Sequence, residues 1–248
     1  MKFQFFRVVS LMTSVVVAGI LLVACKKSDN VDSSAAPVSG LMAFNLATDR
    51  AVGINLSGSS LMSQPLAFEQ YTGNYLNVYS GNRLVQTVDY NTGNSLDSTS
   101  FTFEPQKYYS LFVTGAGGHY RNIIVNDNFD SLSVSADQAY IRYVNAVADS
   151  VAPTVSIGEN MTDDDVNFGA VSDFRAIAPG NVSIRLSNGN TINKERTITL
   201  EKQKAYTVLL AGVPGSTAND SLQIRFIENG ALQQKAQKAS SASSEATN

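Results

Sequence analysis

The feature that most constrains the fold of this chain is an internal repeat with an offset near 100 residues. Residues 104–115 read EPQKYYSLFVTG and residues 201–212 read EKQKAYTVLLAG, so Glu, Gln, Lys, Tyr and Gly coincide. Further pairs occur in the same order: residues 42–47 with 142–146, residues 75–81 with 174–180, and residues 123–128 with 224–229. Ordered matches at one offset indicate a duplicated structural unit. We therefore expect two tandem copies of one small domain.

Strand patterns dominate both copies. Residues 182–187 alternate between apolar and polar side chains, which is typical of a half-buried strand. Asn188 and Gly189 then predict a tight turn, because both tolerate positive φ, and residues 192–200 return as the partner strand. The nearly continuous apolar run at 204–211 suits a central strand. The chain is predicted to be all-β, with two tandem Ig-like antiparallel β-sandwich domains, each with its own core.

The pattern divides the chain into five parts. Residues 1–24 resemble a signal peptide, and residues 25–39 form a flexible tether rich in Ser, Asp and Ala. The first sandwich is expected at 40–130 and the second at 137–230. Residues 231–248 have almost no large apolar side chain, so we expect a disordered tail.

The N-terminal residues predict the cellular location of the protein. A basic start with Lys2 and Arg7 precedes an apolar stretch that ends in Leu-Val-Ala-Cys at residues 22–25. This ending is similar to the lipobox of bacterial lipoproteins, in which the cysteine is acylated, and residues 26–32 resemble the stretch that follows the lipidated cysteine in Bacteroidota. The resemblance implies a lipid anchor on Cys25 and attachment to the outer membrane, on its periplasmic or cell-surface face.

The second copy resembles a known family. The resemblance covers residues 139–212 and extends more weakly to residues 40–128. It implies an Ig-like sandwich of the cell envelope, with no assigned activity and no catalytic residues. The segments that carry it are 139–146, 152–158, 166–174, 178–180 and 205–208, and the family is the domain-of-unknown-function 4397 family.

Composition argues against several classes of function. The net charge is −3 and no cluster of basic residues follows the pair at 26–27, which disfavours a nucleic-acid groove. One cysteine and one histidine provide few ligands for a transition metal. The glycine-rich segment 114–119 precedes a strand pattern and therefore predicts a hairpin, with His119 as a turn residue. Glu104 and Glu201 recur but belong to different copies, so a turn before the long strand explains them better than paired catalysis. We expect no enzyme activity and no cofactor.

An acidic segment is the one candidate for a metal site. Asp163, Asp164 and Asp165, with Glu159 and Asn167 nearby, gather oxygen ligands of the kind calcium prefers. Consecutive residues of a strand point to opposite faces, and the spacing differs from that of an EF-hand. Calcium binding and a solvated acidic loop both remain open.

Four tyrosines are the candidate ligand-binding residues. Tyr71, Tyr75, Tyr79 and Tyr90 fall within twenty residues, and the pattern places Tyr75 and Tyr79 on one strand face. Exposed Tyr rings can stack on sugars or anchor a partner protein, although Tyr is also simply favoured in strands.

Four serines are candidate O-glycosylation sites, because each follows Asp in the Asp-Ser-aliphatic or Asp-Ser-Thr pattern that resembles Bacteroidota acceptor sites. Ordinary turn composition is the alternative explanation. The serines are Ser98, Ser131, Ser150 and Ser221.

The sequence favours a non-catalytic cell-envelope lipoprotein that acts as a binding or structural module at the membrane surface. The partners would be the membrane, through the lipid on Cys25, and a glycan or an envelope protein. The alternatives are a glycan-binding accessory lipoprotein of a polysaccharide-uptake system and, less favoured, an envelope hydrolase.

Overall fold

The computed structural model describes residues 36–133, 137–147 and 151–232. The predicted signal peptide, Cys25, Ser150 and the chain from residue 233 onward lie outside these residues, so the predictions made for them stay predictions. Within the described part, no helix has the length and apolar character needed to cross a membrane.

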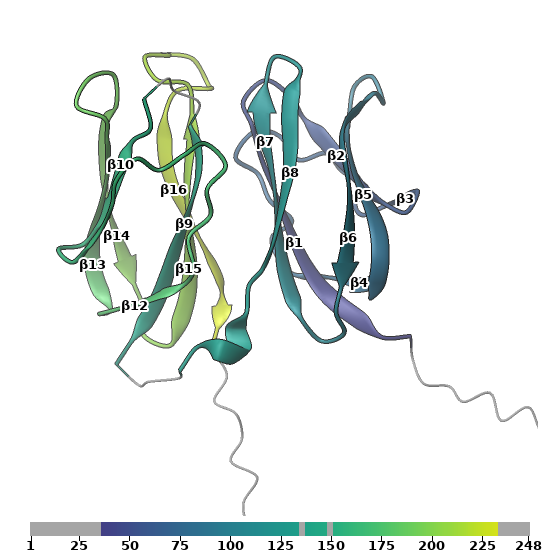
Figure 1. Cartoon of the computed structure of the whole chain (residues 1–248), viewed down its shortest axis with the longest axis horizontal. Coiled ribbons are helices and arrows are strands. Elements are labelled where there is room, and N and C mark those ends of the chain that lie inside the picture. The colour runs from purple at the N-terminus through teal and green to yellow at the C-terminus, as the bar shows by residue number, and fades with distance from the viewer. Residues whose placement is uncertain (1–35, 134–136, 148–150, 233–248) are drawn as a thin grey trace, which may run out of the picture. The chain divides into compact units, whose positions relative to one another are not determined.

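The first copy folds into two four-stranded sheets (Figure 1), with strand orders β4-β1-β7-β8 and β3-β2-β5-β6. A short 3-10 helix, η1 (Phe129–Ser131), follows the last strand. The strands are β1 (Val38–Ala47), β2 (Val52–Leu56), β3 (Ser59–Ser60), β4 (Leu76–Tyr79), β5 (Gly81–Asp89), β6 (Ser95–Phe103), β7 (Tyr108–Ala116) and β8 (His119–Asn126).

The second copy repeats this arrangement strand for strand. Its sheets have the orders β12-β9-β15-β16 and β11-β10-β13-β14. The predicted duplication is therefore confirmed at the level of topology, as is the all-β sandwich fold. The strands are β9 (Ala139–Val147), β10 (Thr154–Ile157), β11 (Met161–Asp163), β12 (Arg175–Ile177), β13 (Gly180–Ser187), β14 (Asn193–Leu200), β15 (Lys204–Gly212) and β16 (Gln223–Ala231).

One feature departs from a purely antiparallel sandwich. In each copy the first strand runs parallel to the seventh, as β1 with β7 and β9 with β15, whereas the other strand pairs are antiparallel. The partners of a parallel pair lie far apart in sequence, and side-chain alternation carries no information on strand direction. The sequence pattern therefore gave the strands but not this pairing.

The predicted turns are present. β13 and β14 are joined at Asn188 and Gly189, where Gly189 has φ 74° and the Asn188 side-chain oxygen accepts hydrogen bonds from the backbone N–H of Asn190 and Ile192. The glycine-rich segment of the first copy is the β7–β8 hairpin, as predicted, and its exposed His119 begins β8.

The recurring Glu residues mark a turn held by a tyrosine. The Tyr109 hydroxyl accepts a hydrogen bond from the backbone N–H of Glu104 at 2.9 Å, and the Tyr206 hydroxyl accepts one from Glu201 at 3.1 Å. This is the geometry of the tyrosine corner of Ig-like sandwiches. The prediction of a turn before the long strand is confirmed.

A buried asparagine recurs in the first strand of each copy. The Asn45 side-chain amide donates to the Leu66 carbonyl at 2.9 Å, and Asn145 donates to the Val166 carbonyl at 2.8 Å. Each Asn side-chain oxygen also accepts a hydrogen bond from the backbone N–H two residues later. Both asparagines thus hold a long connecting segment against the first strand.

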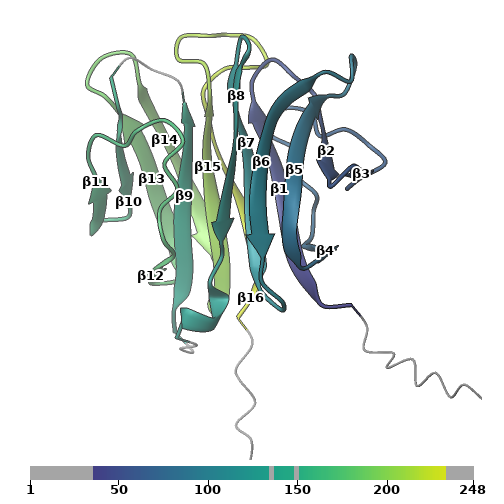
Figure 2. The same cartoon turned by 45° about the vertical axis from the view of Figure 1, so that its right-hand side comes forward.

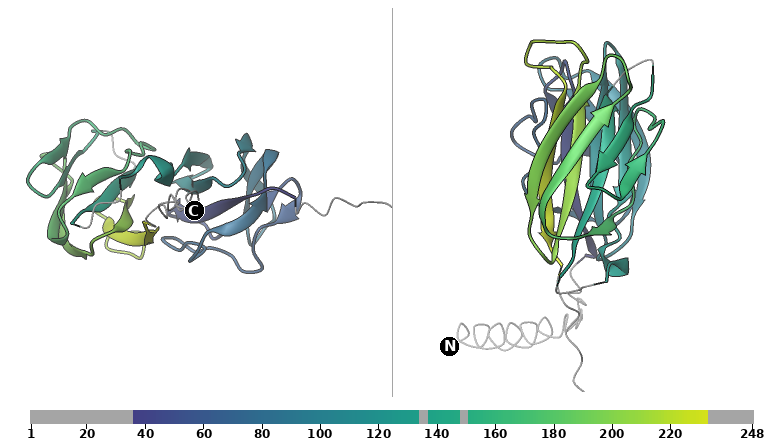
Figure 3. Two further views of the ribbon diagram at one scale, coloured as in Figure 1. Left: turned by 90° about the horizontal axis from the view of Figure 1, so that it is seen from below. Right: turned by 90° about the vertical axis from the view of Figure 1, so that its left-hand side faces the viewer.

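Each sandwich has its own apolar core, and a third cluster lies between the sandwiches. Figure 1 shows the four sheets as successive layers, Figure 2 shows them turned by 45°, and the left view of Figure 3 shows the same order from below. Because the two inner sheets face one another, β1 and β9 are buried on both faces along nearly their whole length. The sequence did not predict this third cluster.

The strand limits shift two predicted boundaries slightly. β1 begins at Val38, and Ser39 is buried and donates a hydrogen bond to the Glu104 carbonyl, so the first sandwich begins before residue 40. β16 extends to Ala231.

Candidate functional site

The four candidate tyrosines do not form one surface. Tyr71 stacks on Phe44 with ring centroids 5.5 Å apart, and Tyr75 is half-buried, with its hydroxyl bonded to residues of both sandwiches. Tyr79 and Tyr90 are exposed, by 62% and 50%. Tyr79 lies in β4, whereas Tyr75 precedes that strand and accepts a hydrogen bond from Asn229 of the second sandwich.

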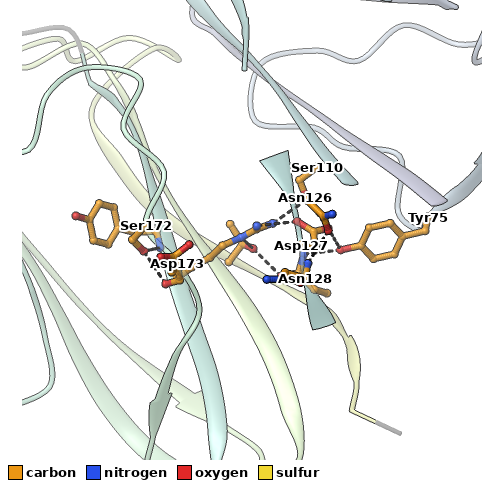
Figure 4. A network of polar contacts seen from close by, with 11 residues as sticks. Tyr75, Ser110, Asn126, Asp127, Asn128, Ser172 and Asp173 are labelled. Carbon is orange, nitrogen blue, oxygen red and sulfur yellow. Dashed lines mark hydrogen bonds and ion pairs between the residues drawn. The ribbon is translucent and has the colours of Figure 1, made fainter. Parts of the chain in front are cut away.

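Tyr75 belongs to a buried polar network that joins the two copies (Figure 4). Its hydroxyl donates to the Asp127 carboxylate and accepts a hydrogen bond from the Asn229 side chain at 3.1 Å. Burial, followed by the nearby negative charge of Asp127, raises the pKa of the Tyr75 hydroxyl, which therefore stays protonated as a donor.

Arg142 is the centre of this network. Its guanidinium forms an ion pair with Asp127 at 2.7 Å, and both side chains are almost completely buried. It also donates to the hydroxyls of Ser110 at 2.7 Å and Thr207 at 2.9 Å. The ring of Phe174 covers it at 4.4 Å. One Asp127 oxygen accepts hydrogen bonds from Tyr75 and Ser110, and the other contacts the guanidinium through the ion pair alone. An ion pair so enclosed holds the copies in a defined register, because losing either charge would leave the other buried and unpaired.

A small cavity lies beside the network. It has a volume of about 290 Å³ and is lined partly by Asp127, Arg142 and Phe174. Asn126, Asn128, Ser172 and Asp173 also line it (Figure 4). Ligand pockets usually have volumes of roughly 300–1,000 Å³, so this cavity stands at the lower limit and suits water or a very small polar molecule.

A larger open groove of about 720 Å³ lies on the first sandwich, along the segment that connects β3 to β4. Its walls are mainly apolar and its rim carries several polar side chains, which is the composition of a ligand site. The apolar lining residues are Leu61, Met62, Pro65, Leu66, Tyr71 and Leu76, and the polar ones are Ser63, Gln64, Glu69, Gln70 and Thr72.

Glu69 is the unusual residue of this groove. It has φ 63°, a left-handed conformation that costs a non-glycine residue about 1–2 kcal/mol. One carboxylate oxygen pairs with Arg225 of the second sandwich at 2.7 Å, whereas the other is buried without a hydrogen-bond partner. In the second copy Gly169 occupies the same position, since both residues donate their N–H to the carbonyl of the buried asparagine, Asn45 or Asn145.

A family model matches the chain twice, over residues 39–152 and 139–241, under the description Domain of unknown function (DUF4397). The chain belongs to the DUF4397 family. Each match begins in the first strand of one sandwich, and the two matches overlap at residues 139–152.

Among curated proteins, nothing matches the chain. One solved structure with similarity is that of CBMbc (family CBM26) from Eubacterium rectale Amy13K in complex with maltoheptaose. The two share 11% identity over 75% of this chain and 100% of that one, with a TM-score of 0.24. This similarity is too low to support an argument about fold or function.

The acidic segment of this DUF4397 chain does not assemble a metal site. Asp163 forms two hydrogen bonds with Arg175, at 2.7 and 3.1 Å, and Asp164 accepts one from Thr154. Burial raises the pKa of the Asp163 carboxyl, but hydrogen bonds from Arg175 and Tyr143 outweigh it and lower the pKa overall. Among the described residues, no three His, Cys, Asp or Glu side chains converge to hold an ion. The calcium candidate is therefore corrected to an acidic strand end and turn, in which Asp165 is exposed.

The candidate glycosylation serines lie in different environments. Ser98 is exposed in β6 rather than in a turn, Ser131 is exposed in η1, and Ser221 is half-buried before β16. The aspartates before two of them have structural roles, because Asp97 accepts a hydrogen bond from the Asn122 backbone and Asp220 accepts one from Ser216.

Arg142, Asp127 and Glu69 were not predicted as functional residues from the sequence. A charged residue inside the apolar first strand of the second copy was the available signal for Arg142. For Glu69, the signal was a Glu in one copy opposite a Gly in the other, which becomes visible only once the segments are aligned through Asn45 and Asn145.

Proposed function

We propose that this protein is a non-catalytic glycan-binding lipoprotein of the cell envelope, held at the outer membrane by a lipid on Cys25. The groove of the first sandwich would hold the glycan, and the second sandwich would support the first. The lipobox at residues 22–25 supports the anchor.

Glu69 is the observation that carries the proposal. The left-handed backbone and the unpaired carboxylate oxygen both cost stability. The second copy shows that the same fold closes with Gly169, so folding does not require a Glu there. A residue that costs stability and lines a groove is a candidate for function.

The groove chemistry favours a glycan. Its polar rim residues are neutral except for Glu69, and side-chain amides and hydroxyls can both donate to and accept from sugar hydroxyls. The apolar wall, including Tyr71, offers a surface for the C–H face of a sugar ring. The open form of the groove suits a chain rather than a small enclosed molecule.

An envelope hydrolase is less well supported. His119 lies exposed at a hairpin, and Glu104 and Glu201 belong to different sandwiches, where each begins a turn held by a tyrosine.

The variant Glu69→Gly tests the proposal. The full chain would be screened on an array of neutral and acidic oligosaccharides, and the strongest signal measured by titration. We expect Glu69→Gly to weaken binding at least about tenfold, while the free energy of unfolding stays the same or rises by up to about 1 kcal/mol.

The matched control is Gln106→Gly, which changes another residue at positive φ (60°) in a turn outside the groove. It should leave glycan binding unchanged. If Glu69→Gly lowers stability by more than 1 kcal/mol and leaves binding intact, Glu69 serves its ion pair with Arg225 and the proposal fails.

An exposed patch on the first sandwich favours a protein partner as a second candidate function. Val38, Tyr79 and Tyr108 are 38%, 62% and 47% exposed. Strand pairing sets Val38 opposite Tyr79, and Tyr108 opposite Gly40, two residues along β1 from Val38. The second copy has Ala178 and Ala205 in place of the two tyrosines. Tyr79→Ala should change the free energy of unfolding by at most about 0.5 kcal/mol. Loss of glycan binding in this variant would move the glycan site from the groove to the patch.

A further inference from the structure

The two inner sheets contact one another through equivalent positions. The strand registers of the two copies make Met42 equivalent to Arg142, Phe44 to Val144 and Phe112 to Leu209. All six residues contact the opposite sandwich or belong to the apolar cluster between the sandwiches. The same face of the module is thus used twice.

A contact made from the first sandwich to the second has a counterpart made from the second sandwich to the first. Glu69 of the first sandwich pairs with Arg225 of the second at 2.7 Å. The strand register makes Ile123 the counterpart of Arg225, one residue beyond the pairing of 123–128 with 224–229 that the sequence indicated. Gly169, the counterpart of Glu69, lies against Ile123: a Cβ added at Gly169 would stand 3.1 Å from the Ile123 side chain. Contacts that interchange in this way define an approximate two-fold relation, which is the form of an isologous dimer interface.

The buried network breaks this symmetry. Arg142 and Asp127 form the ion pair, whereas their counterparts are Met42 and Asn229. Ser110 donates to Asp127 as Thr207 donates to Asn229, so the surrounding hydroxyls are retained in both halves. Only the charges, and the hydroxyl of Tyr75 opposite Phe174, differ.

We infer that this sheet face is a self-association surface of the module, and that the Arg142–Asp127 pair restricts it to pairing a first copy with a second copy. Two first copies would bury each Asp127 opposite Met42, without a cation. Two second copies would bury each Arg142 opposite Asn229, without an anion. An unpaired buried charge opposes either arrangement strongly. Only the mixed pair satisfies both charges.

A cleavable full-length chain tests the inference. A protease recognition sequence replaces residues 134–136, between the sandwiches, and the folded protein is cut and then analysed by gel filtration and native mass spectrometry. The cut halves should stay together as a 1:1 complex at about 1 µM. Arg142→Met should raise their dissociation constant by about 100-fold or more.

The double variant Arg142→Met/Asp127→Asn gives the network the same residue types as the equivalent positions, Met42 and Asn229. It should restore association to within about tenfold of the unmodified protein, and it should also allow pairs of identical halves. Arg175→Met, which removes an ion pair within the second sandwich, is the control and should leave association unchanged.

Three results would overturn the inference: cut halves that separate at 1 µM, an Arg142→Met variant that associates as tightly as the unmodified protein, or unmodified halves that form identical pairs as readily as mixed ones.

Discussion

The two copies differ most in the segment between their third and fourth strands. In the first copy, Leu-Met-Ser-Gln-Pro at residues 61–65 leads to Glu69 and Tyr71. In the second copy, the third strand ends at Asp163, and Asp164 and Asp165 lead to Gly169 and Val171. One copy thus carries an apolar groove with a strained Glu, and the other carries an acidic turn with a relaxed Gly.

This difference arises on an identical frame. In both copies the segment is held by a buried asparagine and by a bridge to the first strand, Phe44 with Tyr71 and Val144 with Val171. The frame therefore fixes the path of the segment and leaves its side chains free to change. What differs between the copies at this position reports on function, and what recurs reports on folding.

Truncating Phe44 and Val144 tests whether the copies contribute equally to the apolar cluster between them, and Phe44→Ala should have the largest effect on stability. Phe44 is fully buried and stacks on Tyr71 and Phe112, so Phe44→Ala should lower the free energy of unfolding by about 3–5 kcal/mol. Its counterpart Val144→Ala removes fewer atoms and should cost about 2 kcal/mol. Urea denaturation measures both, and equal losses would contradict the unequal filling of the cluster.

The buried asparagines test the common frame. Asn45→Ala removes the side-chain donor to the Arg50 carbonyl and the acceptor for the Ala47 N–H, while the Leu66 carbonyl keeps its bond from the Val52 N–H. Asn145→Ala removes the donor to the Val166 carbonyl and the acceptor for the Val147 N–H, so each variant should cost about 2–3 kcal/mol. Thermal unfolding followed by circular dichroism should give similar losses for the two variants. If one variant is tolerated, the copies do not share the frame.

The tyrosine corners also compare the two copies, with a smaller expected change in stability. Tyr109→Phe and Tyr206→Phe keep the ring and remove one hydrogen bond to a backbone N–H, so each should cost about 1 kcal/mol. Because the bonds have nearly the same length, calorimetric melting should show shifts of similar size. A shift in only one variant would mark that corner alone as structural.

The smallest effect belongs to the second copy alone. The pKa of Asp163 is lower in the folded than in the unfolded chain, so its ion pair with Arg175 adds stability above the unfolded pKa of about 4, and this is lost as pH falls through the folded pKa. The pair is half-buried and worth at most about 1 kcal/mol. Asp163→Asn should therefore flatten the stability profile below pH 4 and lower stability slightly at pH 7, as measured by urea denaturation at several pH values. An unchanged pH profile would show that the ion pair between Asp163 and Arg175 does not contribute to stability.

Much of the fold could be predicted from sequence, because it rests on local patterns. The alternation at residues 182–187, the Asn188–Gly189 turn and the run at 204–211 each specify a strand or turn without distant partners. The parallel pairing of β1 with β7 and the facing of the inner sheets could not be predicted, since both depend on contacts between segments far apart in sequence.

The candidate site was less predictable for the same reason. Clustering of Tyr71, Tyr75, Tyr79 and Tyr90 suggested one platform, but the Tyr75 hydroxyl belongs to the network between the sandwiches and only Tyr71 lines the groove. The environment of Glu69 depends on its backbone angle and on Arg225, about 150 residues away in a different sandwich.

The groove makes the first copy the proposed binding module. Backbone amide spectra of the isotope-labelled chain, titrated with the oligosaccharide that gives the strongest array signal, test it most directly. If the groove binds the oligosaccharide, the chemical-shift changes should be concentrated at residues 61–76, and the equivalent residues 161–175 should be unaffected. Changes at residues 161–175 instead, or spread equally over both copies, would contradict it.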